Sequence, residues 1–497
     1  MNPLLTVQEI RTLIENDYNS DKKRYARTGQ RYYEANHDIK KAIIFFVDAE
    51  GNVKEDRTRS NIVISHPFFT ELVDQSTQYT LSGDGRLFRS DDSELQKWLD
   101  LYFNENEDFS AELYEILTGR EVAGWAYAYA YKNADGRTAY MWADALGVVE
   151  VRASEADDKC EHVIYWYVDR IGKDGKAVKR IQVWDSKTVY FYTQIDDGPI
   201  IPDKDEVINP RPHITYKKDG DDAVYYEDYG FIPFFRIDNN RKRISSLKPI
   251  KAMIDDYDLM NCGLSNNIQD AAEVLVVVTG FEGDDLDGLM QNIKAKKHIG
   301  VGENGGVEYK TIDIPVEARK VKMEIDEANI FRFGMGVNTE ALKDTSATTS
   351  IAIKAAYSLL DLKANRTEIQ LKQFLRRLLR PVLDEINREN QTDYKQSDVY
   401  FVFEREIITN AMENAQIELT QAQTRNMEIT TLQNIAQMFD NETIMRQICE
   451  WLEIDYEDIK DKLPAPEAVI DPYTAQKALD GIVPEDQEDD AGGDMIG

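Results

Sequence analysis

Apolar residues recur along the chain with two different periods, and the change from one period to the other marks its parts. Up to about Lys41, and again between residues 67 and 123, the spacing is mostly helical. Pro67 suits the first turn of a helix, and Gly83 and Gly85 suit its exit. The residues from Arg59 onward predict a strand that leads into this helix.

Beyond residue 123 the period becomes two. Trp125, Tyr127, Tyr129 and Tyr131 alternate with alanines, which predicts a strand with one bulky face. Further strands follow, so an antiparallel sheet is expected over residues 122–237. The Asp-Gly pairs at residues 135–136 and 174–175 fit hairpin turns. A platform for base stacking is one interpretation of the aromatic stripe, but core packing is favoured because no basic residues lie between the rings.

A helical period returns over residues 245–272. Its apolar seam has steps of four and three and comprises Ile250, Ile254, Tyr257, Asn261, Leu264 and Ile268. A helix with one narrow seam packs against other helices, in its own chain or in a neighbouring copy. Residues 273–314 predict a small strand–helix–strand unit, and Pro315 starts a returning helix over residues 315–335. The two helices are therefore expected to form a hairpin stem with a cap at its tip.

Glycines and hydroxyl residues interrupt the helical pattern over residues 336–350. A very long helix is expected from Ile351 to Asn390, with a kink at Pro381, and the segment 351–408 ends in a strand. Further helices are predicted over residues 409–463. The last segment, residues 464–497, is rich in proline and acidic at its end, which is typical of a disordered tail.

Length and charge narrow the function. The chain has 497 residues, enough for roughly two to four structural units. A formal net charge of -32 excludes a protein that grips nucleic acid over its whole surface, because such proteins neutralise phosphates with basic side chains. An acidic surface keeps a subunit soluble, and it also repels DNA so that a strand slides without sticking.

Cysteine usage and hydropathy indicate the compartment. Cys160, Cys262 and Cys449 lie far apart and form no zinc or disulfide pattern, which favours a reducing environment. The chain starts without a recognisable signal peptide and has no run of about 18 apolar residues. A soluble protein that is made and used in a cytoplasm is therefore expected.

Catalytic and metal-binding patterns are weak. There is no P-loop, and the glycines at residues 300, 302 and 305 precede a predicted strand instead of the helix that dinucleotide binding needs. The run Asp284, Asp285 and Asp287 resembles part of a calcium loop, but Lys294 stands where the last carboxylate ligand would be. The histidines are isolated, without a paired spacing for metals. We therefore expect no enzyme, no metal and no cofactor.

The order of these parts and three local segments resemble a known family. The segments are Asn61 with Leu72–Gly85, then Ser245–Gly280, and then Thr345–Arg366. They are similar to the N-terminal motif, the stem helix and the tunnel loop of portal proteins of siphovirus-type tailed phages. The resemblance spans about Asn61 to Leu463. It implies an α+β, predominantly helical fold with parts called wing, stem, clip, tunnel loop and crown.

Boundaries follow from placing the predicted elements on this family pattern. The parts are a wing (1–244), a stem helix (245–272), a clip (273–314), a returning stem helix (315–335), a tunnel loop (336–350), a long helix with a strand (351–408), a helical crown (409–463) and an acidic tail (464–497).

The resemblance also implies a function. Such proteins form a ring, usually of twelve subunits, at one vertex of the capsid, where it is the channel for DNA packaging and ejection. Implied partners are the terminase large subunit, head-completion or adaptor proteins, the major capsid and scaffold proteins, and double-stranded DNA in the channel. The ring would assemble in the host bacterial cytoplasm and stay in the virion, with no membrane involved.

Two alternatives remain open. A structural adaptor or scaffold protein of a viral head would share the helices and the acidity without closing a channel. A nucleic-acid-modifying enzyme with a carboxylate metal site is the second, and the lack of a clustered acidic and histidine signature counts against it.

The resemblance assigns three groups of candidate site residues. An acidic, channel-facing part of the stem helix would comprise Asp255, Asp256 and Asp258. The tunnel loop and its border would present Thr339, Lys343, Asp344, Thr345, Ser346, Thr348, Thr349 and Lys354. A docking surface on the clip would comprise Asp284, Asp285, Asp287, Lys294, Lys296 and Lys297. For any single lysine, a solvated surface charge is the simpler interpretation.

Lys343 provides a test of the tunnel-loop assignment. The substitution Lys343→Glu is expected to leave ring assembly intact and to impair packaging, because a transient attraction to passing phosphates would become repulsion. The measurement is the yield of packaged DNA, taken together with the mass of the assembled ring. An unchanged yield would remove this lysine from the channel.

Overall fold

A computed structural model describes most of the first four hundred residues. The described ranges are 5–48, 50–57, 59–83, 86–154, 160–172, 175–217, 223–271, 275–279, 305–310, 315–339 and 350–405, with four isolated residues beyond them. The chain divides into two compact units, Met1–Ile407 and Ile408–Gly497. The predicted crown (409–463) and tail (464–497) belong to the second unit and lie almost entirely outside the described residues.

The chain begins with two short helices, α1 (Val7–Tyr18) and α2 (Asp21–Tyr33), and a 3-10 turn, η1 (Asp38–Lys41). Thr6 and Glu9 form a reciprocal capping box at the start of α1, and Ser20 caps α2. These elements confirm the helical period predicted up to about Lys41.

Four helices form the core of the body. They are α3 (Phe68–Thr80), α4 (Ser93–Leu99), α5 (Glu107–Ala123) and the long α10 (Ser350–Asn390). Pro67 lies at the N-cap of α3, one residue before the first turn in which the sequence analysis placed it, and Pro381 lies inside α10. Gly124 ends α5 with a φ of 100°, and a Cβ there would lie 2.6 Å from the carbonyl oxygen of Arg243. Only glycine therefore allows the sharp turn from α5 into the first strand of the sheet.

The strands form several antiparallel groups instead of one sheet. A three-stranded sheet has the order β14-β4-β5, and a larger one has the order β10-β9-β8-β7-β6 with β11 also paired to β9. The strands are β4 (Trp125–Lys132), β5 (Thr138–Ala143), β6 (Val148–Val151), β7 (His162–Ile171), β8 (Ala177–Trp184), β9 (Thr188–Ile195), β10 (Ile201–Pro202), β11 (Arg211–Pro212) and β14 (Phe234–Asp238).

The strands described within residues 122–237 are antiparallel, but they divide among three sheets instead of forming one continuous sheet. The chain turns at residues 144–147, where Gly147 lies so close to Trp166 that a Cβ would be 2.4 Å from its carbonyl oxygen. This turn separates β6 from β5. β4 pairs with β5 on one side and on the other with β14, which follows about a hundred residues later. Sequence periodicity identifies strands but does not specify their partners.

Small paired elements complete the first unit. They are β1 (Phe45–Val47) with β2 (Val53–Glu55), β3 (Phe88–Arg89) with β17 (Tyr400–Phe401), β12 (Ile214–Lys217) with β13 (Val224–Glu227), and β15 (Leu275–Thr279) with β16 (Gly306–Lys310). The strand predicted before residue 408 is thus only two residues long. β15 and β16 confirm the two strands of the predicted strand–helix–strand unit, whose helix lies outside the described residues.

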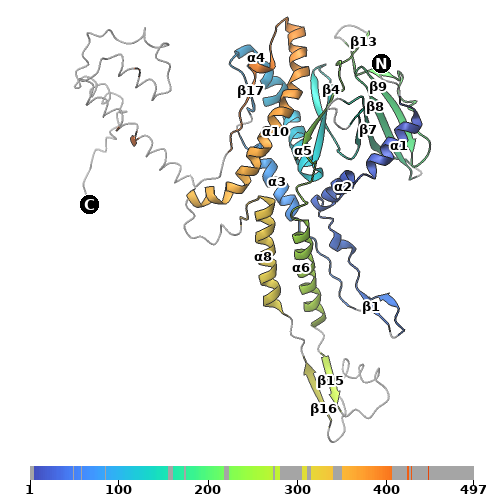
Figure 1. The fold of residues 1–497 in the computed structure, drawn as a ribbon, viewed down its shortest axis with the longest axis vertical. Helices are drawn as coiled ribbons and strands as arrows, with labels where there is room; N and C mark the ends of the chain where they lie inside the picture. Colours follow the sequence, from blue (N-terminus) through green and yellow to red (C-terminus); the bar gives the residue numbers. More distant parts are fainter. Residues whose placement is uncertain are drawn as a thin grey trace, which may run out of the picture. The chain divides into compact units, whose positions relative to one another are not determined.

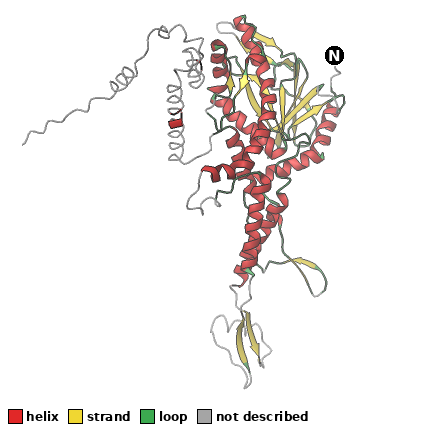
Figure 2. Ribbon diagram, turned by 60° about the vertical axis from the view of Figure 1, so that its left-hand side comes forward, coloured by secondary structure: helices red, strands yellow, loops and turns green. Residues whose placement is uncertain are grey.

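Alternation of small and large residues on β4 joins the layers of the body. Its alanines, such as Ala128, face α5 and α10 and contribute to a core with Phe374 and Leu378 of α10. Its aromatic residues Trp125 and Tyr127 face the other way and pack against the larger sheet. Figures 1 and 2 show the helices on one side of the sheets and α1 on the outer side of the larger sheet. Core packing is therefore the role of the aromatic stripe.

Two further helices, α6 (Lys251–Ala271) and α8 (Val316–Gly334), run side by side away from this body (Figure 1). They are helical over residues 251–271 and 316–334, whereas residues 245–250 form turns before α6 begins. Residues from Arg59 to His66 are extended, but they pair with no described strand and instead follow α6.

The body core generates a stability prediction with a control on the same helix. Leu375→Ala removes a fully buried side chain of α10 and is expected to lower the free energy of unfolding by about 2–5 kcal/mol. Leu362→Ala removes an exposed side chain of the same helix and should change it by less than about 0.5 kcal/mol. Urea unfolding, monitored by circular dichroism, measures the free energy of unfolding of both variants. Equal losses would contradict this assignment of the core.

Candidate functional site

The paired helices α6 and α8 carry the acidic residues that the sequence assigns to a channel. Near the body, Ile254 of α6, Ile250 just before it, and Ile330 and Phe331 of α8 are buried together with residues of α2 and α3. Farther along, Lys322 of α8 pairs with Asp256 of α6. The apolar seam predicted on α6 is thus confirmed at its first half. In its second half, Ile268 is exposed in the single chain.

A segment that we call the strap, Ser60–His66, lies along α6. Its backbone N–H groups at alternate positions donate to side chains of α6 at every fourth position. Ser60 donates to Asp270 at 3.1 Å, Ile62 to Asn266 at 2.6 Å, Ile64 to the sulfur of Cys262 at 3.2 Å, and His66 to Asp258 at 3.0 Å. The strap therefore runs antiparallel to α6. Side chains of α6 accept the backbone hydrogen bonds that a neighbouring strand would otherwise accept.

Helix and strand geometry explain why this ladder stays in register. Four residues of an α-helix rise about 6 Å, and two residues of an extended strand advance about 6.6 Å. The two repeats differ by so little that four successive contacts stay in register. Each step satisfies a backbone donor that would otherwise need water or another strand.

Asp258 is the centre of this arrangement. Its carboxylate is 0% exposed and accepts from the Nδ1 of His37 at 2.6 Å and from the Nδ1 of His66 at 2.8 Å, besides the strap. The ring of Tyr32 stacks on His37 at 4.4 Å. Burial disfavours the charged form, but the hydrogen bonds from His37 and His66 outweigh it and lower the pKa of Asp258.

The prediction that Asp258 faces the channel was therefore wrong. Its charge lies inside a single subunit, tied to residues of the turn before η1 and of the strap, and neighbouring copies would only bury it further. An apolar-seam analysis of α6 places Asp258 on the polar side. It does not reveal that another segment of the chain covers that side.

Asp255 and Asp256 lie nearer the surface, and each has a cationic partner. Lys251 bridges Asp255 at 2.6 Å and Asp38 at 2.7 Å, and the hydroxyl of Tyr32 also donates to Asp255. Burial opposes the charge of Lys251, but its hydrogen bonds with Asp255 and Asp38 raise its pKa well above the usual range. The side chains of Asp255 and Asp256 are 35% and 39% exposed. That they face a channel stays a prediction, and the paired lysines reduce the repulsion they would exert on phosphate.

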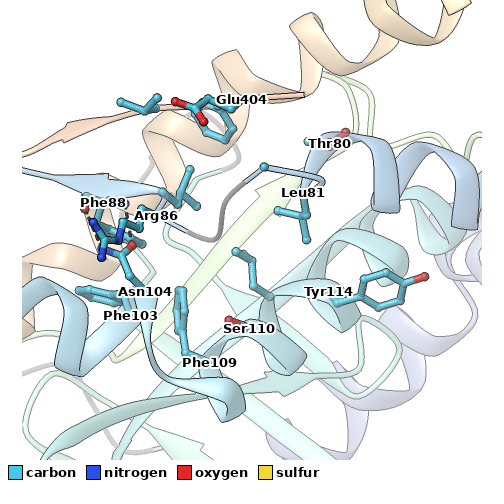
Figure 3. Close-up of a pocket in the computed structure, with 15 residues that line it drawn as sticks. Thr80, Leu81, Arg86, Phe88, Phe103, Asn104, Phe109, Ser110, Tyr114 and Glu404 are labelled. Atoms are coloured by element: carbon cyan, nitrogen blue, oxygen red, sulfur yellow. Dashed lines mark hydrogen bonds between the residues drawn. The ribbon is translucent and has the colours of Figure 1, made fainter. Parts of the chain in front are cut away.

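One small cavity in the body lies among packed aromatic side chains. It has a volume of about 240 Å³ and lies between the end of α3, α5 and the β3–β17 pair (Figure 3). Phe88, Phe103 and Phe109 form much of its wall, and Asn104 hydrogen bonds to both the backbone N–H and the carbonyl of Phe88. These groups serve packing, since the polar side chain of Asn104 is used by its own neighbours.

Within the described ranges, no group of three or more histidine, cysteine or acidic residues is placed to hold a metal ion. Among the helices whose residues are described, none is long and apolar enough to cross a membrane.

Comparison with known proteins identifies the family. The model of the family described as "Phage portal protein, SPP1 Gp6-like" matches residues 12–461. This range includes the strap, both stem helices and α10. The chain belongs to this portal protein family.

Two relatives support the assignment. The chain is 27% identical over 350 residues to a portal protein of Bacillus phage SPP1, covering 70% of this chain and 67% of the relative. It is 24% identical over 432 residues to a portal protein of Clostridium phage phiCD119, covering 83% of this chain and 89% of the relative.

Solved structures match more distantly. A chain described as "Neck of native GTA particle computed with C12 symmetry" is 11% identical, with a TM-score of 0.39 over 78% of this chain and 90% of that chain. A second, from the neck of an empty GTA particle computed with C6 symmetry, has a TM-score of 0.32 at 12% identity, over 59% of this chain and 72% of that chain. Scores this low carry no argument about assembly.

Of the tunnel-loop residues of this portal protein, the structure describes only the two at its borders. Thr339 is exposed, and Lys354 lies in α10. Lys343, Asp344, Thr345, Ser346, Thr348 and Thr349 lie outside the described residues, as do the clip residues Asp284, Asp285, Asp287, Lys294, Lys296 and Lys297. Their roles remain predictions.

The residues that lead into the predicted tunnel loop are held by side chains of two helices. Gln75 of α3 bonds to both the N–H and the carbonyl of Val337, each at 3.0 Å. The side chain of Asn338 donates to Glu327 of α8 at 2.9 Å. At Gly336 a Cβ would lie 2.2 Å from the end of the Leu72 side chain, so a larger residue there would force Leu72 to shift. The loop thus starts from a point that two helices position.

Sequence analysis missed the strap ladder, although the signal is present. Asp258, Cys262, Asn266 and Asp270 are short polar residues at a strict spacing of four. Read as one stripe, they indicate a helix face that binds another segment through polar groups. If these four residues are taken only as part of a polar helix surface, they indicate solubility and not a binding face.

The ladder predicts an alternating pattern of hydrogen exchange. The amides of Ser60, Ile62, Ile64 and His66 should exchange more slowly than those between them, because only the former donate to α6. Mass spectrometry with residue-level fragmentation measures this.

A variant and its control sharpen the test. Asn266→Ala should speed exchange at Ile62 roughly fivefold, since one hydrogen bond contributes about 1 kcal/mol. Gln269→Ala, an exposed residue of the same helix, should leave Ile62 unchanged. Uniform exchange along the strap would contradict the ladder.

Proposed function

We propose that this portal protein is the subunit of a ring, usually of twelve copies, at one vertex of a phage capsid. The ring would be the channel for DNA packaging and ejection. The observation that carries the proposal is the family match over residues 12–461, which spans nearly the whole chain. Within the described residues, the exposed apolar side chains of the stem support it, because they suit contacts with neighbouring copies.

The stem helices supply the side chains closest to a channel in this proposal. Asp255 and Asp256 would repel phosphate, and the net charge of -32 would keep DNA from adhering. Their pairing with Lys251 and Lys322 makes the repulsion moderate, which suits a strand that must pass and not be expelled. The tunnel-loop residues, including Lys343 and Lys354, would add transient contacts.

The clip would dock the terminase large subunit during packaging and head-completion proteins afterwards. The major capsid and scaffold proteins would contact the ring during assembly in the host bacterial cytoplasm, and the product would stay in the virion. Portal proteins are structural, and we propose no catalytic step and no cofactor for this chain. A viral-head adaptor without a channel is the alternative, and the family match favours the portal.

Mass and shape test the proposal directly. Light scattering of the purified protein should give about twelve times the subunit mass of 57.1 kDa, and negative-stain images of the same fraction should show rings with a central hole. The measurement is repeated with scaffold and capsid proteins present. Chains that stay monomeric under both conditions would end the ring proposal and favour the adaptor.

A further inference from the structure

The β1–β2 hairpin, which we call the arm (residues 45–55), exposes apolar side chains on both faces of its first strand. Its residues Phe45, Phe46, Val47 and Val53 all have strongly exposed side chains, with Val47 at 66% and Val53 at 67%. A hairpin that lies on the surface normally alternates polar and apolar residues, so that one face meets water. The first strand of the arm does not alternate, because three consecutive apolar residues occupy it, and the charged residues Lys54 and Glu55 lie on the second strand.

Such a ribbon has little stability by itself. Two strands without a covering layer are marginal in water, and exposed apolar edges invite pairing with another chain. Two hydrogen bonds fix the base of the arm. The backbone N–H of Asp56 donates to the carbonyl of Ile44 at 2.8 Å, and the side-chain amide of Asn61 donates to the carbonyl of Ala42 at 3.1 Å. The ladder then ties the following strap to α6. The arm is thus a positioned apolar element without a described covering layer in its own subunit.

α8 carries a second exposed apolar surface. Ala318, Val321, Ile325 and Ala328 recur at steps of three and four, and all four are exposed, Val321 at 51% and Ile325 at 52%. This stripe is distinct from the side of α8 that faces α6, which carries Lys322 and Met323. Exposed residues with this spacing form a face suited to packing against another apolar element.

The two surfaces lie at opposite edges of the stem. In Figure 1, α8 lies on one side of α6 and the arm with β1 on the other. Contacts of α6 agree, because Asp256 and Gly263 meet α8 while Cys262 and Asn266 meet the strap. The strap keeps the arm on its own side, so it does not reach α8 of the same chain.

We infer that the arm of one subunit packs on the α8 stripe of the next copy of this chain. The inference rests on the proposed ring. A closed ring is a head-to-tail assembly, in which one edge of each copy meets the opposite edge of its neighbour. The arm and the stripe are apolar surfaces at those two edges, and each would cover the other. The strap ladder then acts as the fixed base from which each arm crosses to its neighbour.

Photo-crosslinking tests which surface the arm meets. Phe46 is replaced by p-benzoylphenylalanine in the full chain, the assembled fraction is irradiated, and the products are separated by size and digested. The expected result is a series of covalent multimers in which the probe is joined to a peptide from residues 315–334. The same probe at Val207, an exposed residue of the body, should not join that peptide.

A charge substitution supplies a second measurement. Val321→Glu should raise the concentration at which rings dissociate roughly tenfold or more, because an unpaired carboxylate would lie under the arm. Val207→Glu is the matched control and should leave it unchanged. Both residues are exposed in the single chain, so thermal unfolding of the subunit should be the same for both variants.

The outcomes separate this inference from the proposed function. Rings that form normally, with the probe joined elsewhere and with Val321→Glu dissociating like the wild type, would overturn the arm contact and leave the ring standing. Chains that never assemble, alone or with scaffold and capsid proteins, would overturn both. Multimers linked through residues 315–334, together with weakened Val321→Glu rings, would support both.

Discussion

The buried carboxylate of Asp258 is the constraint around which the stem of this protein is organised. It accepts hydrogen bonds from His37, from the ring of His66 and from the backbone of the strap. An ionised group that is fully buried is stable only when all of these donors are present, so it brings three separate parts of the chain to one point. From this point the strap follows α6 by a repeated spacing, and the arm obtains a fixed base.

A second buried carboxylate, that of Glu121, joins helices of the body. Glu121 of α5 is buried and pairs with Lys363 of α10 at 2.7 Å, while Ser76 of α3 donates to it at 2.7 Å. Burial opposes its charge, but Lys363 and Arg120 outweigh that penalty and lower its pKa. Three helices are thus tied by one carboxylate. Around it, the alanine face of β4 lets α5 and α10 approach closely, and the aromatic face fills the space toward the larger sheet.

The distribution of bound and exposed side chains on α6, α8 and the arm is consistent with the ring proposal. Several acidic residues of α6 are bound inside the subunit, by the strap and by paired lysines, whereas apolar residues remain exposed on the arm and on α8. Membership of the portal protein family supplies the reason for such an arrangement, because a ring subunit buries its edges only on assembly. In the proposed ring, charge would act on the DNA and apolar contact would act between copies.

The sequence by itself determined the periodic elements and their order, because helix and strand spacing, Pro67 and the Asp135–Gly136 turn act locally. The family pattern likewise follows from that order. Which strands pair and which acidic residues are buried was decided only by tertiary structure. β4 pairs with a strand about a hundred residues away, and Asp258 is covered by His37 and the strap, far from it in sequence. Packing and the hydrogen bonding of buried polar groups determine these partners. Neither can be deduced from the local sequence pattern.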